Sequence, residues 1–186
     1  MTTLPQEPVT REQFIAWEQY QESRHELVAG RISYFPGVTI EHSTIAGAVF
    51  VALVTHVGDG PCRVHGADMM IETCRGIRYS DGVVTCDEGD RIPNIRTLRA
   101  PKLIVEVLSE STAAVDRGAK LDEYRAISSL EEYVLIDSRK RWATAHRRIQ
   151  GEWRASQPIV AGELSFASVG LALDLDRIYR KAGVDA

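Results

Sequence analysis

The sequence predicts an α/β domain in which helices pack against a mixed β-sheet. The clearest sign is the run over 103–108, Leu-Ile-Val-Glu-Val-Leu, which is typical of a strand buried on both faces. Segments with helical spacing of apolar residues alternate with shorter strand-like runs elsewhere in the chain. With 186 residues, 44% of them hydrophobic and 26% charged, the chain is long enough to form one domain with a substantial core.

The first third of the chain is expected to hold two helices and a pair of strands. Residues 1–9 are expected to be a flexible start, and Thr10 with Gln13 three residues later matches a capping box that opens a helix. Ala29-Gly30 predicts a turn between two short strands. The elements expected here are a helix over about 10–22, strands over 25–28 and 31–35, and a helix from about 39 to 56.

The remaining two thirds predict mainly short strands, with two further helices. Asp59-Gly60-Pro61 ends the preceding helix, and Ser111-Thr112 can cap the next one. No internal repeat or linker interrupts the chain, so a single domain over 1–186 is expected. The expected strands are 62–65, 69–73, 78–85, 102–109, 133–136, 142–149, 153–155 and about 164–166, with helices over about 111–127 and 175–181.

Cysteine usage and hydropathy predict the compartment. Cys62, Cys74 and Cys86 are odd in number and form no CxxC pair, which argues against a disulfide framework and a zinc knuckle, so we expect small buried residues on strands. The N-terminus lacks a signal-peptide pattern, and the longest apolar stretch, 46–54, is too short to span a bilayer. We therefore expect a cytoplasmic protein without a membrane segment.

Three residues suggest chemistry when they are taken together. A carboxylate within the buried 103–108 run costs several kcal/mol unless a partner compensates it, and Asp81 lies in a similar strand-like setting. If Asp81 and Glu106 lie on neighbouring strands, they can share a hard divalent cation such as Mg²⁺. Lys120, on the helix expected after the Glu106 strand, could orient an attacking water or stabilise charge on a phosphate.

Each of these residues also has a plainer interpretation. Asp81 next to Gly82 could shape a turn, and Glu106 could face solvent from an edge strand. Lys120 follows Asp116 by four residues, a spacing that forms exposed ion pairs on helices. The combination is more specific than any member alone.

The order of motifs resembles the Uma-two family of restriction-endonuclease-like proteins, formerly a domain of unknown function. The resemblance covers roughly residues 10 to 180, and its most specific part is Val105-Glu106-Val107-Leu108-Ser109 followed by residues of the next helix. It implies the PD-(D/E)XK nuclease fold, a mixed sheet flanked by helices, whose members use Mg²⁺ to hydrolyse phosphodiesters. The other matching motifs are Glu26-Leu27-Val28, His42, Tyr79-Ser80-Asp81, Ser111-Thr112, Asp116, Lys120, Tyr124 and Glu132-Tyr133.

The resemblance also implies roles for individual residues. Asp81 matches the first metal-binding acid and Glu106 the second, with the Val107 carbonyl as a further ligand. Leu108 occupies the usual place of the lysine, and Lys120 looks like its relocated counterpart on the next helix. Glu26 matches an additional acid at the metal or its water shell, whereas no role follows for His42. Ser80, Glu110 and Ala29 depart from the usual family residues without removing a ligand.

A basic stretch near the C-terminal third is the candidate nucleic-acid contact. No acid occurs from Ser138 to Gln150, and the charges there could flank a phosphate backbone if the segment forms a hairpin. The alternative is a hairpin with ordinary surface arginines, and the formal net charge of −4 does not favour a strong general binder. The basic residues are Arg139, Lys140, Arg141, Arg147 and Arg148.

The leading hypothesis is a DNA endonuclease that depends on Mg²⁺, or on Mn²⁺ in its place. A homodimer is expected because cutting two strands usually needs two sites. Two alternatives stay open: a non-catalytic nucleic-acid-binding or assembly module that retains the fold, and a hydrolase of another phosphodiester such as RNA or a nucleotide. The sequence contains no GxSxG elbow, P-loop, GxGxxG or HExxH motif that would favour another enzyme class.

Overall fold

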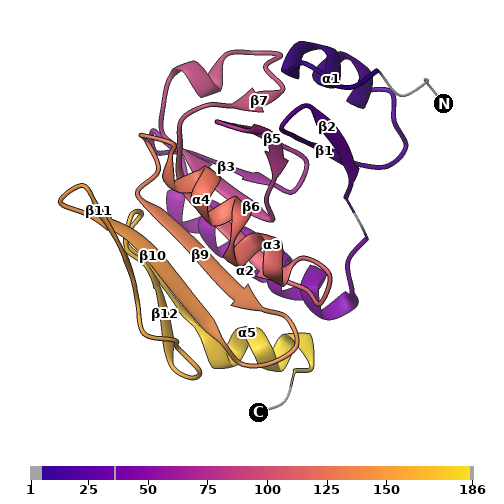
Figure 1. The fold of residues 1–186 in the computed structure, drawn as a ribbon. Helices are drawn as coiled ribbons and strands as arrows, with labels where there is room; N and C mark the ends of the chain where they lie inside the picture. The colour runs from indigo at the N-terminus through magenta and orange to yellow at the C-terminus, as the bar shows by residue number, and fades with distance from the viewer. Residues whose placement is uncertain (1–5, 36, 185–186) are drawn as a thin grey trace.

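A computed structural model describes residues 6–35 and 37–184, and these form two β-sheets, a separate hairpin and five α-helices (Figure 1). The larger sheet has the order β11-β10-β9-β8-β6-β3. Its strands are β3 Arg63–Gly66, β6 Gly82–Thr85, β8 Pro101–Leu108, β9 Glu132–Asp137, β10 Ala143–Ile149 and β11 Glu152–Ala155.

The smaller sheet has the order β2-β1-β5-β4-β7. Its strands are β1 His25–Val28, β2 Arg31–Tyr34, β4 Met70–Thr73, β5 Gly76–Tyr79 and β7 Thr97–Leu98. The hairpin pairs β12 Glu163–Phe166 with β13 Leu171–Asp174. The helices are α1 Arg11–Glu18, α2 Ile40–Val57, α3 Ala113–Arg117, α4 Ala119–Arg125 and α5 Leu175–Ala182, with a 3-10 turn η1 at Gly89–Arg91.

Strand β8 lies inside the larger sheet, parallel to β9 and antiparallel to β6. Alternate residues of β8 face opposite sides, because side chains along a strand point alternately to its two faces. Val105 packs in the cluster that includes α2 and α5, whereas Ile104 and Leu108 pack in the cluster that includes α4. The predicted mixed sheet flanked by helices is therefore confirmed, and Glu106 shares the α4 face.

Two predicted elements are divided in the structure. The strand expected over 78–85 is two strands, because β5 pairs with β1 and β4 in the smaller sheet while β6 pairs with β3 and β8 in the larger one. Ser80 and Asp81 form the corner between the two sheets. The helix expected over 111–127 is divided at Gly118, whose φ of −118° and ψ of −97° are not helical. Strands β7 and β13 were not predicted.

The expectation that the cysteines are buried and form no disulfide is wrong. Cys62 and Cys86 form a disulfide, and Cys74 is a free, exposed cysteine. The antiparallel pairing of β3 with β6 sets Arg63 opposite Thr85, so the residues just beyond them face each other, with 4.0 Å between the Cα atoms of Cys62 and Cys86. The pairing of β3 with β6 brings the two cysteines together, and this pairing cannot be predicted from the spacing of the cysteines in the sequence.

One helix in the described part of the chain, α2, is long and apolar enough by length and composition to cross a membrane. It packs here on the larger sheet through Ile45, Val49 and Leu53. The helix begins at Ile40, close to the predicted start near residue 39, and the Thr39 side chain caps its first turn by accepting a hydrogen bond from the His42 amide at 3.3 Å.

Candidate active site

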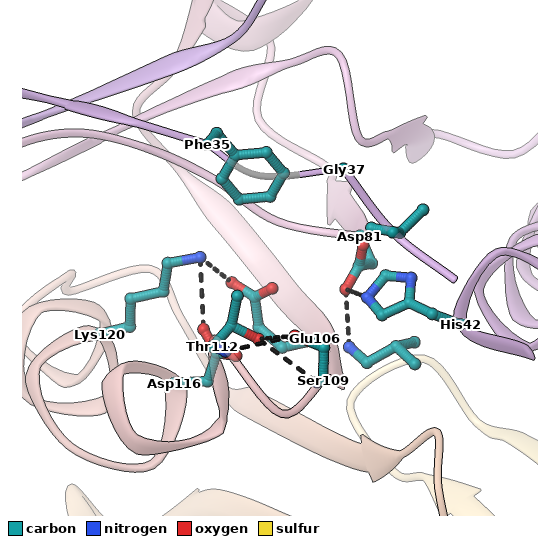
Figure 2. Close-up of a pocket in the computed structure, with 11 residues that line it drawn as sticks. Phe35, Gly37, His42, Asp81, Glu106, Ser109, Thr112, Asp116 and Lys120 are labelled. Carbon is teal, nitrogen blue, oxygen red and sulfur yellow. Dashed lines mark hydrogen bonds and ion pairs between the residues drawn. The ribbon is translucent and has the colours of Figure 1, made fainter. Parts of the chain in front are cut away.

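The sequence-predicted acids and lysine meet at a small cavity where β8 ends, α2 begins and the corner between the sheets turns (Figure 2). The cavity measures about 10 Å³, which is room for about one water-sized sphere. Its walls come from three stretches that are distant in sequence: the end of β2 with the start of α2, the corner at Asp81, and the stretch from β8 to α4. The lining residues are Phe35, Gly37, Val38, His42, Asp81, Glu106, Val107, Ser109, Thr112, Asp116 and Lys120.

Lys120 is buried at the centre of this group, on the first turn of α4. Its Nζ donates to Glu106 Oε1 at 3.0 Å and to the Tyr79 carbonyl at 2.9 Å. The same Nζ lies 3.3 Å from Glu26 Oε1 and 3.4 Å from Asp116 Oδ1. The pair with Asp116 expected from the four-residue spacing is present, but it is buried, so the exposed-pair interpretation of Lys120 is wrong.

Asp81 lies beside Glu106 because the corner continues the pairing of β6 with β8. Its backbone N–H donates to the Val105 carbonyl at 3.1 Å. Its Oδ2 accepts a hydrogen bond from the Val107 N–H at 2.7 Å and lies 3.3 Å from His42 Nε2. Glu106 is buried on an internal strand, so it does not face solvent from an edge.

The ionisation of the site reflects burial and an excess of acids. Burial raises the pKa of Glu106 well above its usual range; the charges of Asp116 and Asp81 add to the effect, and Lys120 opposes it. Burial likewise raises the pKa of Asp116. Burial lowers the pKa of Lys120, but the surrounding carboxylates outweigh this and raise it well above its usual range. The site therefore holds the lysine charged and favours additional positive charge, as a proton or another cation.

His42 contacts Asp81 from the first turn of α2. Burial lowers the pKa of His42, but its hydrogen bond to Asp81, the Asp81 charge and the Val107 carbonyl outweigh burial and leave the pKa raised. The other ring nitrogen, Nδ1, is buried without a hydrogen-bond partner. No role for His42 followed from the sequence. In the structure His42 contacts Asp81, one of the two predicted metal-binding acids.

Comparison with known proteins identifies the family. The Uma2 family model, described as "Putative restriction endonuclease", matches residues 11–176. The chain belongs to the Uma2 family. An uncharacterized protein of Synechocystis sp. is 31% identical over 181 residues, which cover 96% of this chain and 95% of that protein. A second uncharacterized Synechocystis protein is 29% identical over 132 residues, covering 69% of this chain and 75% of that protein.

The fold agrees with this family. The crystal structure of a "putative nuclease belonging to DUF820" from Anabaena variabilis has a TM-score of 0.77 and 18% sequence identity, covering 94% of this chain and 99% of that chain. The predicted family and nuclease-like fold are confirmed.

The Uma2 site rests on a buried ion-pair network that the sequence did not predict. Arg78 on β5 donates from NH1 to Glu26 Oε2 at 2.7 Å and from NH2 to Glu123 Oε1 at 2.6 Å. Burial raises the pKa of Glu123, but the bonds to Arg78 outweigh it and leave the pKa lowered. Tyr124 donates to Glu106 Oε1 at 3.2 Å. The sequence offered two signals of this network: Arg78 lies three residues before Asp81, and Glu123 lies three residues after Lys120.

The donor types of this Uma2 chain are those that Mg²⁺ takes, although the cavity as it stands has room for about one water. Among residues 6–35 and 37–184, no three His, Cys, Asp or Glu side chains are grouped so as to hold a metal ion. Mg²⁺ characteristically takes only one or two carboxylates and completes its shell with waters and substrate phosphates. Asp81 and Glu106 provide two carboxylates, and the buried Asp116 Oδ1 makes no hydrogen bond, its nearest positive charge being Lys120 Nζ at 3.4 Å. The site holds more carboxylates than basic side chains, and a bound cation would neutralise this excess negative charge.

The five basic residues of the predicted nucleic-acid contact lie on two different parts of the β9–β10 hairpin. Arg139 and Lys140 are exposed at the turn after β9, which ends level with β8. The arginines also have protein partners in this structure, so their contact with nucleic acid stays a prediction. The partners are Asp137 for Arg139, Asp176 for Arg141, Glu132 and the Ser165 carbonyl for Arg147, and the carbonyls of Arg125, Ile127 and Ser128 for Arg148.

Proposed function

We propose that this Uma2 protein is a Mg²⁺-dependent endonuclease that hydrolyses phosphodiester bonds of DNA. The observation that carries the proposal is the buried Lys120 ammonium, 3.0 Å from Glu106 and next to the Asp81 corner, in a chain of this family. Two carboxylates can hold a metal ion, and a lysine can stabilise the negative charge that develops when a metal-dependent enzyme hydrolyses a phosphodiester.

Each residue has a proposed role. Asp81 and Glu106 would hold the cation with the Val107 carbonyl, and Mn²⁺ would be accepted by the same oxygen ligands. The bound metal would supply positive charge that lowers the pKa of a water and polarises the phosphate. Lys120 would donate to that water or to a phosphate oxygen, and Glu26, 3.3 Å from its Nζ, would hold the ammonium in place.

The proposed DNA contacts are the basic residues of the β9–β10 hairpin. Arg139 and Lys140 are exposed at the end of the sheet where β8 reaches the site, so they are the first candidates for phosphate contacts. Arg141, Arg147 and Arg148 would contribute charge farther along the hairpin. Because Arg148 donates to three backbone carbonyls, replacing it would also loosen the hairpin, and Lys140→Ala is the cleaner test.

The test is cleavage of supercoiled and single-stranded DNA with Mg²⁺ or Mn²⁺ by wild type, Glu106→Gln and Glu131→Gln prepared identically. Glu131 is an exposed residue paired with Lys102, remote from the cavity, so this variant should cut like wild type. Metal-dependent cutting that disappears only in Glu106→Gln supports the proposal. Equal cutting by all three proteins would contradict the role of Glu106.

The small size of the cavity favours a second candidate function. The cavity holds about 10 Å³, and Lys120 is already surrounded by Glu106, Glu26 and Asp116, so the same network could serve a non-catalytic DNA-binding or assembly module. Calorimetric titration with Mn²⁺ separates the two functions. Binding that is lost in Asp81→Asn favours the nuclease, whereas DNA binding that requires Lys140 but neither metal nor Glu106 favours the module.

A further inference from the structure

Helix α2 exposes an apolar face that lacks a partner within the described fold. A surface helix normally carries charged residues opposite its buried stripe. The eighteen residues of α2 include one acid, Glu41, and no lysine or arginine. Ile45, Val49 and Leu53 cover the sheet, yet only 22% of the residues of the helix are buried.

The outward residues of α2 follow the spacing of a helix-pairing seam. Ile40, Thr44, Gly47, Val51 and Val54 are separated alternately by four and three residues, and Val51 is 63% exposed. We call these five residues the α2 seam. Alternating four- and three-residue spacing is the pattern by which one helix packs along another in coiled-coil geometry.

Gly47 at the middle of the α2 seam has no explanation within one chain. Glycine in a helix interior is unfavourable compared with alanine, and a Cβ atom added at Gly47 would meet nothing within 4 Å. The fold therefore does not need a glycine there. A second helix crossing at this point would explain the glycine, because the smallest residue at a crossing allows the closest approach of two helix axes.

A groove continues the α2 seam on one side. It measures about 850 Å³ and lies between α2, β13 and α5. Its apolar floor includes Leu173, while its rim carries both an acid, Asp174, and the bases Arg177 and Lys181. A rim with both signs of charge is self-complementary, since a two-fold axis can bring the acid of one copy to a base of the other.

We propose that the α2 seam is the contact between two copies of this chain, packed antiparallel about a two-fold axis at Gly47. In this arrangement Gly47 meets its own counterpart, and Ile40 of each copy lies against Val54 of the other. The uncharged seam favours an apolar partner, and a second copy supplies the same stripe. The dimer requires neither metal nor DNA, so its test is independent of the proposed nuclease activity.

Sedimentation velocity tests the contact with a matched pair of substitutions. Wild type should sediment at twice the 20.7 kDa chain mass, and Val51→Glu should sediment as a monomer with an unchanged circular dichroism spectrum. Val160→Glu is the control, because Val160 is a similarly exposed valine, at 57%, that lies outside the seam and the groove. A dimer in both variants would overturn the proposal.

Disulfide cross-linking tests the antiparallel arrangement. In a Cys74→Ser background, Gly47→Cys should form a covalent dimer on mild oxidation because the two positions meet at the axis. Val54→Cys should not, since antiparallel packing separates the two copies of residue 54 by about 20 Å along the helix. Cross-linking through Val54→Cys would overturn the arrangement. A wild type that remains monomeric would overturn the contact itself, and binding of that monomer to phospholipid vesicles would assign the face to lipid.

Discussion

At the scale of single residues, Lys120 and Glu106 decide the electrostatics of the site together. The lysine lies within 3.4 Å of three carboxylates, so its charge is shared among them. Glu106 is left with incomplete compensation, and burial raises its pKa well above the usual range. The native state therefore holds a proton on Glu106 at pH values where the unfolded chain has released it.

This proton makes the stability of the metal-free protein depend on pH. Above the unfolded pKa of Glu106 the native state binds more protons, so the free energy of unfolding falls as pH rises toward the folded pKa. His42 acts in the same direction, because its pKa is also raised. Thermal melts of wild type from about pH 5 to about pH 8 should show this decline. The decline should be shallower in Glu106→Gln, and equal slopes in both proteins would contradict the raised pKa of Glu106.

Arg78 is the second residue with a large expected effect. Arg78→Met leaves Glu123 buried without its cation and Glu26 paired with Lys120 alone, which should cost about 3–5 kcal/mol in the free energy of unfolding. Arg99→Met, which breaks a mostly exposed pair with Glu72, should cost no more than about 1 kcal/mol. Urea unfolding of both variants measures the difference, and similar costs would mean that the buried network is not a stabilising one.

At the scale of elements, local signals were predictable and long-range pairing was not. The capping box of α1 is present, with the Thr10 amide donating to Gln13 Oε1 at 2.9 Å, and the β1–β2 pair forms around its predicted turn. The run 78–85 was predicted as one strand, and β5 and β6 are indeed both buried along their whole length. The turn that Asp81 next to Gly82 could shape was the one local sign of the division. Which strand pairs with which depends on segments far away in the sequence, and that pairing creates the corner at Asp81.

The join between β1 and β5 depends on Gly76. A Cβ atom at Gly76 would lie 2.0 Å from the Leu27 carbonyl oxygen, so Gly76→Ala forces these strands apart. The substitution should destabilise the protein by about 1–3 kcal/mol or more. Gly151→Ala is the control, since Gly151 also has a positive φ but faces open space, and strain alone should cost about 1 kcal/mol. Chemical denaturation compares the two, and equal losses would contradict the predicted clash.

At the scale of the whole molecule, the family motifs predicted the residues of the candidate site but not the buried ion pairs that hold those residues in place. Asp81, Glu106, Lys120 and Glu26 come together as the resemblance implied. Arg78 and Glu123 were missed, because a buried ion pair between β5 and α4 is visible only after the chain has folded. The disulfide was missed for the same reason.

The disulfide should raise the stability of the whole domain. Cys62 and Cys86 are 24 residues apart, and closing a loop of this length is expected to contribute about 3 kcal/mol, mainly by restricting the unfolded chain. Urea unfolding with and without a thiol reductant should show a shift of this size in wild type. Cys62→Ser should show no shift, whereas Cys74→Ser should respond like wild type. A wild type insensitive to reductant would mean that the bond contributes little.

Helix α2 carries both His42, which contacts the site, and the α2 seam, and His42 lies five residues before Gly47 at the middle of the seam. Two copies joined at Gly47 would set their His42 residues about 15 Å apart along the helix direction, on axes separated by about 8–10 Å. That spacing is comparable with the width of about 12 Å of the DNA major groove, so a dimer could reach both backbones in one encounter. Supercoiled plasmid would then pass directly to the linear form. The monomeric Val51→Glu protein should accumulate open circles instead, one nick at a time.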